Sequence, residues 1–417
     1  SIDASTYTAD VCRWTAHHLL FRGVGGNAVL ASQGNVYGGK AIWVITGDSA
    51  VVENITFKDA RCVDRNGAGI RLEGHHMVVR SCVFDGNEDG ILVGAIRPCT
   101  MLIEYCEFSN SGFGDGLSHN LYIGAIDTLI FRFNYTHGCK IGHELKSRAD
   151  VNFILFNRLA TEALGTGSRC IDLPNGGIAV ITGNDIQQGP WTQNSNMVGY
   201  GLEGLRGGIN HQLYLSQNTF VSTRSTALFT SFAEGTECVA MWNNLFFGKG
   251  ILWPSATTVG ISSVANIHRD DANGELKDEQ SGNYELNSSS IARDSADWEN
   301  VPMLASELLN PTLEYVHPRS RKVRCEDKRK DVGAHEFCIP VNVFGNEDHV
   351  DDDDVEVVVQ NGTLRFPSVQ SRVIVWTVNG VHVRTYTNIR DIELCHLPQG
   401  ALFLQTPTRI RSLINVR

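Results

Sequence analysis

A short phrase that recurs through the first two thirds of the chain constrains the fold more than any other feature. Each phrase is an apolar run, then a small polar residue or a thiol, then one residue and an apolar side chain: VVENITF (51–57), MVVRSCVF (77–84), MLIEYCEF (101–108), LIFRFNYT (129–136), NFILFNRL (152–159), AVITGNDI (179–186), LYLSQNTF (213–220), VAMWNNLF (239–246) and the weaker GISSVANI (260–267). Successive spacings are 24, 28, 23, 27, 34 and 26 residues, counted over Cys82, Cys106, Asn134, Asn157, Asn184, Asn218 and Asn244. A strand-rich repeat of this length with no helical period predicts stacked coils.

A second short strand with two-residue alternation precedes each phrase. These strands are IWVIT (42–46), IRLEG (70–74), ILVG (91–94), NLYIG (120–124), ELKS (144–147), CIDLP (170–174), LEG (202–204), ALFTS (227–231) and ILWPS (251–255). Two or three short strands per coil, joined by Gly and Asn turns and never by a helix, predict an all-β chain whose main part is a right-handed parallel β-helix.

The Asn positions predict an internal column of side chains. An amide repeated at one turn position can bond to its neighbour about 4.8 Å along the stack, which is the spacing of strands in any sheet. Cys82 and Cys106 would continue the column, either as buried thiols or as a disulfide between adjacent coils. We therefore interpret these residues as architectural.

Alternation in the second strand predicts which side chains are available for chemistry. The expected inward set is Ile70, Leu72, Leu121, Ile123, Leu145, Ile171, Leu173 and Leu202. The expected outward set is Arg71, Glu73, Asn120, Tyr122, Glu144, Lys146, Asp172 and Glu203, with His119, His143, Arg148, Arg169 and Asn175 at or near the strand ends. The outward set is a column of mixed charge, densest over residues 118–177.

This segment resembles β-helix polysaccharide lyases of the alginate-lyase and chondroitinase B type. Those enzymes carry a Lys-Ser strand and an Arg one coil later, and here Lys146 with Ser147 matches the first position and Arg169, 23 residues on, the second. The resemblance implies that Lys146 is the base that removes the proton α to a uronate carboxylate, with Arg169 as acid or charge partner. A Lys base needs its ammonium form disfavoured, and the enolate needs cations.

The candidate residues divide into three groups. The catalytic candidates are Lys146, Arg169, Arg148, His119 and Tyr122, and the substrate-binding candidates are Asn120, His143, Glu144, Asp172, Asn175 and Arg71. The lyase resemblance adds Ca²⁺ as a possible cofactor, for which Glu144, Asp172 and Glu203 would have to be the ligands. The chain departs from the family where Arg-Cys-Ile-Asp stands in place of Arg-His-Gly, and Lys146 could instead simply pair with Glu144 or Asp172.

Composition excludes some partners. With 35 Lys and Arg against 46 Asp and Glu, the net charge is −11, so general binding to nucleic acid is not expected. No apolar run approaches the roughly 20 residues of a membrane span.

The cysteines indicate the compartment. Eleven Cys leave at least one without an intramolecular partner, and Cys325 and Cys338 flank one short segment and could be bridged. This composition is compatible with an oxidising compartment, and we expect a secreted or cell-surface protein.

The chain divides into three predicted parts. We predict a β-helix over residues 1–338 and a small β-sandwich over residues 355–417. Between them, the acidic stretch 339–354 is interpreted as a solvated linker. A calcium loop in the acidic stretch is the alternative, although it lacks the usual spaced ligands. The last part resembles the C-terminal sorting domain of the type IX secretion system of Bacteroidetes, through its V-NG-V hairpin, the phrase LPQGALFL and the end RSLINVR. That resemblance implies export through a secretion machinery.

Two functions are compatible with these features. The first is a secreted carbohydrate-active protein that binds an acidic polysaccharide or cleaves it by β-elimination, with a Lys base and an Arg partner. The second is a non-catalytic surface, adhesive or filament-forming protein that associates with itself. A polygalacturonase-type hydrolase is less compatible, because Gly142-His143-Glu144 matches its Gly-His-Gly only in part and its paired-Asp phrase is missing.

Overall fold

The computed structural model describes residues 1–299, 309–325, 329–338, 358–360, 363–377, 382–393, 400–406 and 409–416. The chain forms two compact units, one made of Ser1–Asn300 and Glu307–Phe337 and the other of Val301–Ser306 and Cys338–Arg417.

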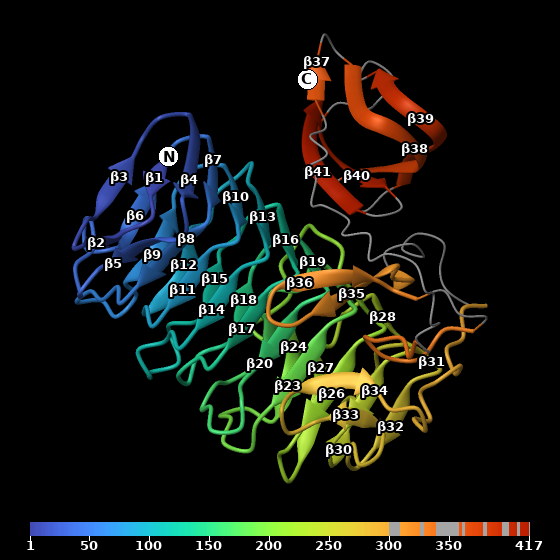
Figure 1. Ribbon diagram of the computed structural model, residues 1–417. Coiled ribbons are helices and arrows are strands. Elements are labelled where there is room, and N and C mark those ends of the chain that lie inside the picture. The colour runs from blue at the N-terminus through green and yellow to red at the C-terminus, as the bar shows by residue number, and fades with distance from the viewer. Residues whose placement is uncertain are drawn as a thin grey trace. The chain divides into compact units, whose positions relative to one another are not determined.

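The first unit is a parallel β-solenoid in which each coil except the last gives one short strand to each of three sheets (Figure 1). Sheet I contains β1 (Ile2–Asp3), β4 (His18–Val24), β7 (Ser49–Glu53), β10 (His76–Arg80), β13 (Thr100–Glu104), β16 (Thr128–Arg132), β19 (Val151–Leu155), β22 (Ile178–Thr182), β25 (Gln212–Ser216), β28 (Cys238–Trp242) and β31 (Ile261–Val264).

Sheets II and III follow the same order. Sheet II contains β2 (Thr6–Thr8), β5 (Ala28–Ala31), β8 (Ile55–Lys58), β11 (Val83–Asp85), β14 (Glu107–Ser109), β17 (Tyr135–His137), β20 (Arg158–Ala160), β23 (Asp185–Gln188), β26 (Thr219–Ser222), β29 (Leu245–Phe247) and β32 (Ile267–Arg269). Sheet III contains β3 (Cys12–Trp14), β6 (Ala41–Ile45), β9 (Ala68–Leu72), β12 (Asp89–Val93), β15 (Leu121–Ile123), β18 (Leu145–Ser147), β21 (Ile171–Leu173), β24 (Asn196–Tyr200), β27 (Ala227–Phe232) and β30 (Gly250–Ile251). The predicted all-β solenoid is thus confirmed.

The predicted Asn column lies inside the turn between sheets I and II. The Nδ2 of Asn157 donates to Asn184 Oδ1 at 3.0 Å and to the carbonyl of Phe131 at 2.9 Å, while Asn157 Oδ1 accepts from the backbone N and Nδ2 of Asn134. The same pattern continues to Asn266. The amide groups of the column are satisfied by the coils above and below, which is why one residue type recurs.

The thiols extend this column as predicted, but not as a disulfide. Cys82 and Cys106 are both free and buried, and the backbone N of Cys82 lies 3.5 Å from Cys106 Sγ, which takes the place of an amide oxygen. In contrast, Cys325 and Cys338 are both disulfide-bonded.

A left-handed residue precedes each position of the column. The backbone φ is positive at Asn54, Ser81, Tyr105, Phe133, Phe156, Gly183, Gln217, Asn243 and Ala265. A positive φ is unfavourable for aromatic residues, yet Tyr105, Phe133 and Phe156 stack along the solenoid with ring centroids 5.2 and 5.4 Å apart. The stacking offsets part of the backbone cost at a turn that every coil must make.

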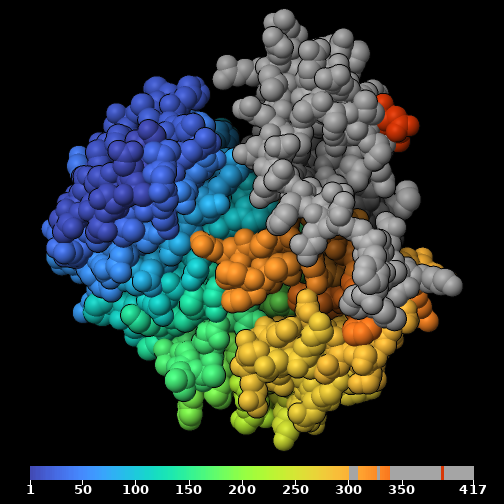
Figure 2. Space-filling view, viewed as in Figure 1, coloured from blue at the N-terminus to red at the C-terminus, as the bar shows by residue number. Residues whose placement is uncertain are grey.

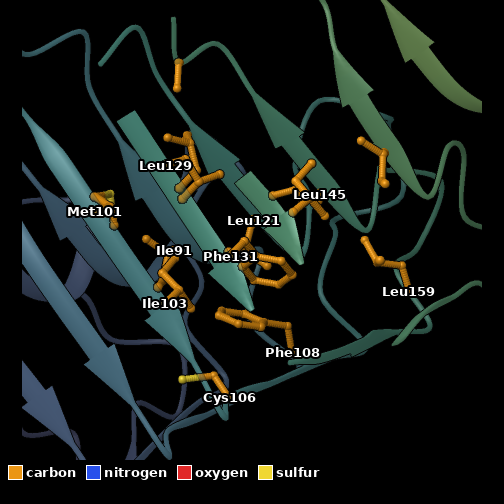
Figure 3. Close-up of a cluster of buried hydrophobic side chains, with 14 of the residues drawn as sticks. Ile91, Met101, Ile103, Cys106, Phe108, Leu121, Leu129, Phe131, Leu145 and Leu159 are labelled. Carbon is orange, nitrogen blue, oxygen red and sulfur yellow. The ribbon is translucent and has the colours of Figure 1, made fainter. Parts of the chain in front are cut away.

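Alternating side chains from all three sheets fill the interior. Figure 3 shows part of this core, in which Ile91, Leu121 and Leu145 of sheet III belong to one buried cluster with Met101 and Leu129 of sheet I. The inward set predicted for residues 70–173 is fully buried. Since inner and outer residues alternate, the outer set of sheet III is fixed by the same register.

Two predicted strands differ from the structure. The strand of sheet III expected at LEG (202–204) is instead β24, and Leu202, expected inside, is 37% exposed in the turn that follows. Of ILWPS (251–255), only Ile251 belongs to a strand. The segment before β24 lacks the apolar alternation of the other coils, so the pattern favoured the wrong stretch.

Charged residues form a separate column on the outside of sheet I. Arg22, Glu53, Arg80, Glu104 and Arg132 are in register on successive strands. Arg80 Nε lies 2.5 Å from Glu104 Oε1, and Arg132 Nη2 lies 2.6 Å from Glu104 Oε2. Alternating signs at one strand spacing stabilise the stack, so this column has a structural explanation.

Two short hairpins follow the last coil, β33 (Leu276–Asp278) with β34 (Asn283–Leu286) and β35 (Leu313–Val316) with β36 (Ser320–Val323). Figure 2 shows the second hairpin, in orange, lying against earlier coils. In the segment after this hairpin, His335 Nε2 lies 2.9 Å from Asp185 Oδ1, and both side chains are buried. The chain therefore folds back and is fastened to sheet II by buried charges.

The second unit contains one antiparallel sheet. Its strands are β37 (Val358–Gln360), β38 (Thr363–Thr377), β39 (His382–Glu393), β40 (Gly400–Thr406) and β41 (Arg409–Val416). The sandwich expected here stays a prediction, and the acidic linker at 339–354 lies outside the described residues. In the described part of the chain, no helix is long and apolar enough to span a membrane.

Candidate functional site

The outer face of sheet III carries a column whose residue type changes at every coil. Tyr122 of β15 pairs in register with Lys146 of β18, Lys146 with Asp172 of β21, and Asp172 with Gly199 of β24. Neighbouring members are one strand spacing apart, about 4.8 Å. The register thus brings a phenol, an ammonium and a carboxylate into contact distance, as the sequence predicted. We call the residues gathered around this column the Lys146 cluster: Tyr122, Lys146, Arg148, Arg169, Asp172, Glu203, His119 and His143.

Lys146 is the central cation. Its side chain is only 10% exposed, and Nζ lies 2.7 Å from Glu203 Oε1 and 3.4 Å from Asp172 Oδ2. The ammonium also lies 5.9 Å from the ring centroid of Tyr122. Two carboxylates and an aromatic face therefore hold the long side chain in one position.

Arg148 follows β18 and contacts three other predicted site residues. Its Nε donates to the Tyr122 hydroxyl at 2.8 Å, Nη1 donates to Asn175 Oδ1 at 2.6 Å, and Nη2 lies 2.5 Å from Glu203 Oε2. Glu203 bridges Lys146 and Arg148. These contacts bring Arg148, Tyr122, Asn175 and Glu203 together.

Glu203 is the most accessible carboxylate of the Lys146 cluster, with its side chain 46% exposed. Burial alone would raise its pKa, but hydrogen bonds from Lys146 and Arg148 outweigh that cost and lower the pKa to about 2. The carboxylate is therefore ionised across the physiological range. A ligand carboxylate that approached the two cations would compete with it.

Asp172 is the buried carboxylate, only 1% exposed. Burial raises its pKa, opposed by the charges of Arg169 and Lys146. Arg169 Nη1 lies 2.9 Å from Asp172 Oδ1, and Oδ2 makes no hydrogen bond although two cationic or polar nitrogens are within 3.5 Å. A Cβ at Gly199 would come within 2.8 Å of Arg169 Cδ, so the glycine leaves room for the Arg169 side chain.

His119 and His143 are stacked at the start of the same strands, with ring centroids 4.8 Å apart. The backbone N of His143 donates to His119 Nδ1 at 3.0 Å, and the backbone N of Arg169 donates to His143 Nδ1 at 3.1 Å. A ring nitrogen that accepts carries no hydrogen, so each neutral ring has its hydrogen on Nε2.

Burial and nearby cations keep both rings neutral. The pKa of His143 is lowered to about 3, first by burial and then by Lys146 and Arg169, and the pKa of His119 is lowered by burial and by His143. His143 Nε2 lies 3.5 Å from Asp172 Oδ2. Since neither ring takes up a proton near neutral pH, both can serve as hydrogen-bond donors but not as cationic acids.

Three predicted site residues lie elsewhere. Glu144 and Asn120, expected on the outer face, are fully buried at the turn before the strands, where Asn120 Nδ2 donates to Glu144 Oε2 at 2.5 Å and the backbone N of Cys139 donates to Glu144 Oε1. Burial raises the pKa of Glu144 to about 7. Both residues precede the point where the alternation begins. Arg71 belongs to the column, but Leu92 separates it from Tyr122.

The three carboxylates predicted as calcium ligands are not gathered. Glu144 faces the interior, whereas the oxygens of Asp172 and Glu203 contact Arg169, Lys146 and Arg148. Among the residues that the structure describes, no group of three or more His, Cys, Asp and Glu side chains is placed to hold a metal ion. The donor set of the Lys146 cluster therefore does not fit Ca²⁺, which needs several oxygen ligands that are not already occupied by cations.

The sequence pattern predicted a strand at residues 202–204 and so missed the turn that carries Glu203. Arg206 in this turn pairs with Asp150, its Nη2 donates to the carbonyl of Arg148 at 2.6 Å, and the backbone N of Glu203 donates to the Pro174 carbonyl at 3.0 Å. The signal was present as the 34-residue spacing between Asn184 and Asn218, the longest in the repeat. An enlarged coil indicates an insertion on one face.

The site is thus a mixed-charge cluster on adjacent coils, with three cations, two carboxylates, a phenol and two neutral imidazoles. Comparisons with protein-family models, with curated proteins and with solved structures found no match for this chain. The functional argument rests on the chemistry of these side chains.

Proposed function

We propose that this protein binds an acidic polysaccharide on the outer face of sheet III and cleaves it by β-elimination at the Lys146 cluster. The observation that carries the proposal is that Lys146, Arg148 and Arg169 gather on adjacent coils of a chain whose net charge is −11. A local group of cations on an acidic protein favours an anionic ligand.

The reaction requires a base, charge stabilisation and a proton for the leaving group. The base takes the proton α to the uronate carboxylate, the C–H electron pair forms the new C=C bond, and the bond from the β-carbon to the glycosidic oxygen breaks. The departing oxygen keeps that electron pair and takes up a proton. Arginine guanidinium groups can bind the carboxylate while its charge grows in the enolate.

Lys146 is the base in this proposal. It first has to be released from Glu203 and lose a proton, and Glu203 can be displaced because it stands on an exposed turn. Tyr122 is the second candidate, because its hydroxyl lies in the same cluster and accepts a hydrogen bond from Arg148. Arg169 and the neutral Nε2 donors of His119 and His143 would bind the carboxylate or the departing oxygen.

Export is part of the proposal. Disulfide bonds persist in oxidising compartments, and both Cys325 and Cys338 are disulfide-bonded. We propose that the protein is secreted or held at the cell surface, and that the second unit is its sorting domain.

The decisive experiment is incubation with alginate, pectate and glycosaminoglycans. Ultraviolet absorbance of unsaturated uronate should rise on at least one of them. Absence of a signal on every substrate would contradict the lyase proposal. Comparison of Lys146→Ala with Tyr122→Phe would separate the two candidate bases, because only the true base is indispensable to proton removal.

One observation favours a second candidate, a non-catalytic surface, adhesive or filament-forming protein. Each cation of the Lys146 cluster already contacts a carboxylate, as in the structural charge column of sheet I. Negative-stain imaging with mass measurement separates the candidates, since regular polymers would support the structural role and a monodisperse monomer would not.

A further inference from the structure

Trp191 is a large apolar side chain that the fold holds out in solvent, 64% exposed. It lies in the turn between β23 and β24, directly before the strand that carries Gly199. An indole ring offers a large apolar face, so an exposed one that belongs to a row of apolar side chains is available for contact with a ligand.

The turn around Trp191 is held firmly. The backbone N of Gly189 donates to Thr161 Oγ1 at 2.7 Å, and Gln188 Nε2 donates to the Asn194 carbonyl at 2.9 Å. The next residue, Thr192, is buried, and its hydroxyl accepts from Arg224 Nη1 at 2.8 Å. The indole is therefore presented by a fixed backbone.

The same turn is bonded to the segment that leads into the Lys146 cluster. The backbone N of Gln193 donates to the Gly167 carbonyl at 2.9 Å, and Asn194 Nδ2 donates to Ser168 Oγ. Ser168 directly precedes Arg169, whose guanidinium contacts Asp172. Trp191 thus stands one coil along from a cation of the cluster, on the side where the sheet III strands begin.

Other exposed apolar residues follow the same edge. Six of the eleven exposed large apolar side chains in the described part of the chain lie in turns from sheet II to sheet III: Tyr37, Val63, Phe113, Leu117, Leu164 and Trp191. The solenoid repeats these turns along its axis, so the row runs parallel to the column of Tyr122 and Lys146. An apolar edge beside a face that carries Lys146, Arg148 and Arg169 fits a ligand that is apolar on one side and anionic on the other.

We propose that Trp191 is a stacking platform for a sugar ring of the acidic polysaccharide, whose carboxylates contact Arg169, Lys146 and Arg148. A pyranose ring presents C–H groups on its face, which pack on an indole, and its carboxylate projects from the edge toward the cations. The inference rests on the proposed function, and its occupant follows from the continuity of the row with the Lys146 cluster and from charge complementarity.

The test measures binding of alginate, pectate and hyaluronan oligosaccharides to the full chain. Trp191→Ala should weaken affinity for the bound oligosaccharide about tenfold, the size of one lost aromatic contact, and Trp191→Phe should retain most of it. Leu20→Ala removes a 57% exposed side chain from sheet I and is the control, expected to bind as the wild type.

A second readout is tryptophan fluorescence. Saturation with the oligosaccharide should change the emission of the wild type, and the change should be lost in Trp191→Phe. Equal affinity of Trp191→Ala and the wild type would overturn the stacking role and leave the proposed function standing. Failure of the wild type to bind any acidic oligosaccharide would overturn both. A wild-type oligomer that Trp191→Ala dissociates would assign the row to contacts between copies of the chain and would also overturn the inference.

Discussion

The Asn column inside the solenoid and the Tyr122 column outside sheet III are built from the same coils but differ in composition. Inside, one residue type repeats from Asn134 to Asn266, and each amide bonds to the next. Outside, Tyr122, Lys146, Asp172 and Gly199 differ from coil to coil. A residue type that repeats, or the regular alternation of charge on sheet I, meets a requirement that successive coils share. A polar column with neither regularity meets a requirement of one place only.

The largest effect on stability is expected for Asn157→Ala. The substitution removes the acceptor of Asn134 N and Nδ2 and the donor to the Phe131 carbonyl, all of them buried. Each unsatisfied buried group costs about 1–3 kcal/mol, so the free energy of unfolding should fall by about 3 kcal/mol or more in denaturant titration. Asn27→Ala, at an exposed site with a single side-chain bond, is the control and should cost under about 1 kcal/mol. Equal losses would mean that the column is not the stabilising element.

Glu144→Gln should alter how stability depends on pH. Burial raises the pKa of Glu144 to about 7, above its ordinary 4.5, so the folded state holds this proton more tightly than the unfolded state. Stability should therefore fall as pH rises from 4.5 to 7, by an amount on the order of 3 kcal/mol. The difference in unfolding free energy between variant and wild type, measured across that range, should grow in favour of Gln. A constant difference would show that Glu144 is not a buried interior acid.

Asp172→Asn should impair the outer column without unfolding the protein. The amide keeps the shape but no longer attracts Arg169 and Lys146, so these cations should lose their fixed positions. Misplacement by about 1 Å can cost on the order of 100-fold in rate, and we expect that loss in kcat/KM for uronate formation. Asp270→Asn, at an exposed site outside the column, should keep wild-type activity. Wild-type kcat/KM in Asp172→Asn would remove Asp172 from the positioning of the cluster.

Glu203→Gln should have the smallest effect on stability. The pKa of Glu203 is lowered to about 2, so its contribution is present above pH 4.5 and lost as pH falls toward 2. Because the side chain is half-exposed, that contribution should stay under about 1 kcal/mol in acid titration of the unfolding free energy. A loss as large as that of Asn157→Ala would make the outer cluster as architectural as the inner column.

Sequence periodicity was sufficient for most of the fold because each coil repeats the same physical problem. The Asn positions, the inward Leu and Ile residues and the neighbourhood of Tyr122, Lys146 and Asp172 follow from period and register alone. The left-handed residues at Tyr105, Phe133 and Phe156 carry no such signal, since their conformation comes from the tertiary turn.

The parts that sequence could not predict lie where the period breaks. Glu144 precedes its strand, which begins at Leu145. The prediction extended the alternation to Glu144 and therefore placed this buried residue on the outer face. The turn with Glu203 and Arg206 belongs to the enlarged coil, where no repeat fixes the geometry. The tautomers of His119 and His143 depend on backbone N–H groups of the next coil, which donate to the Nδ1 atoms of both rings.

The comparison of the two columns is tested most directly by the rate of uronate formation in Lys146→Ala. The wild type should produce unsaturated uronate from an acidic polysaccharide, and Lys146→Ala should lose about 10²–10⁴-fold of that rate. Lys277→Ala, which removes a lysine that pairs with Glu285 away from the cluster, should react as the wild type. Wild-type rates in Lys146→Ala, or no product from any acidic polysaccharide with the intact protein, would contradict the assignment of the outer column to catalysis.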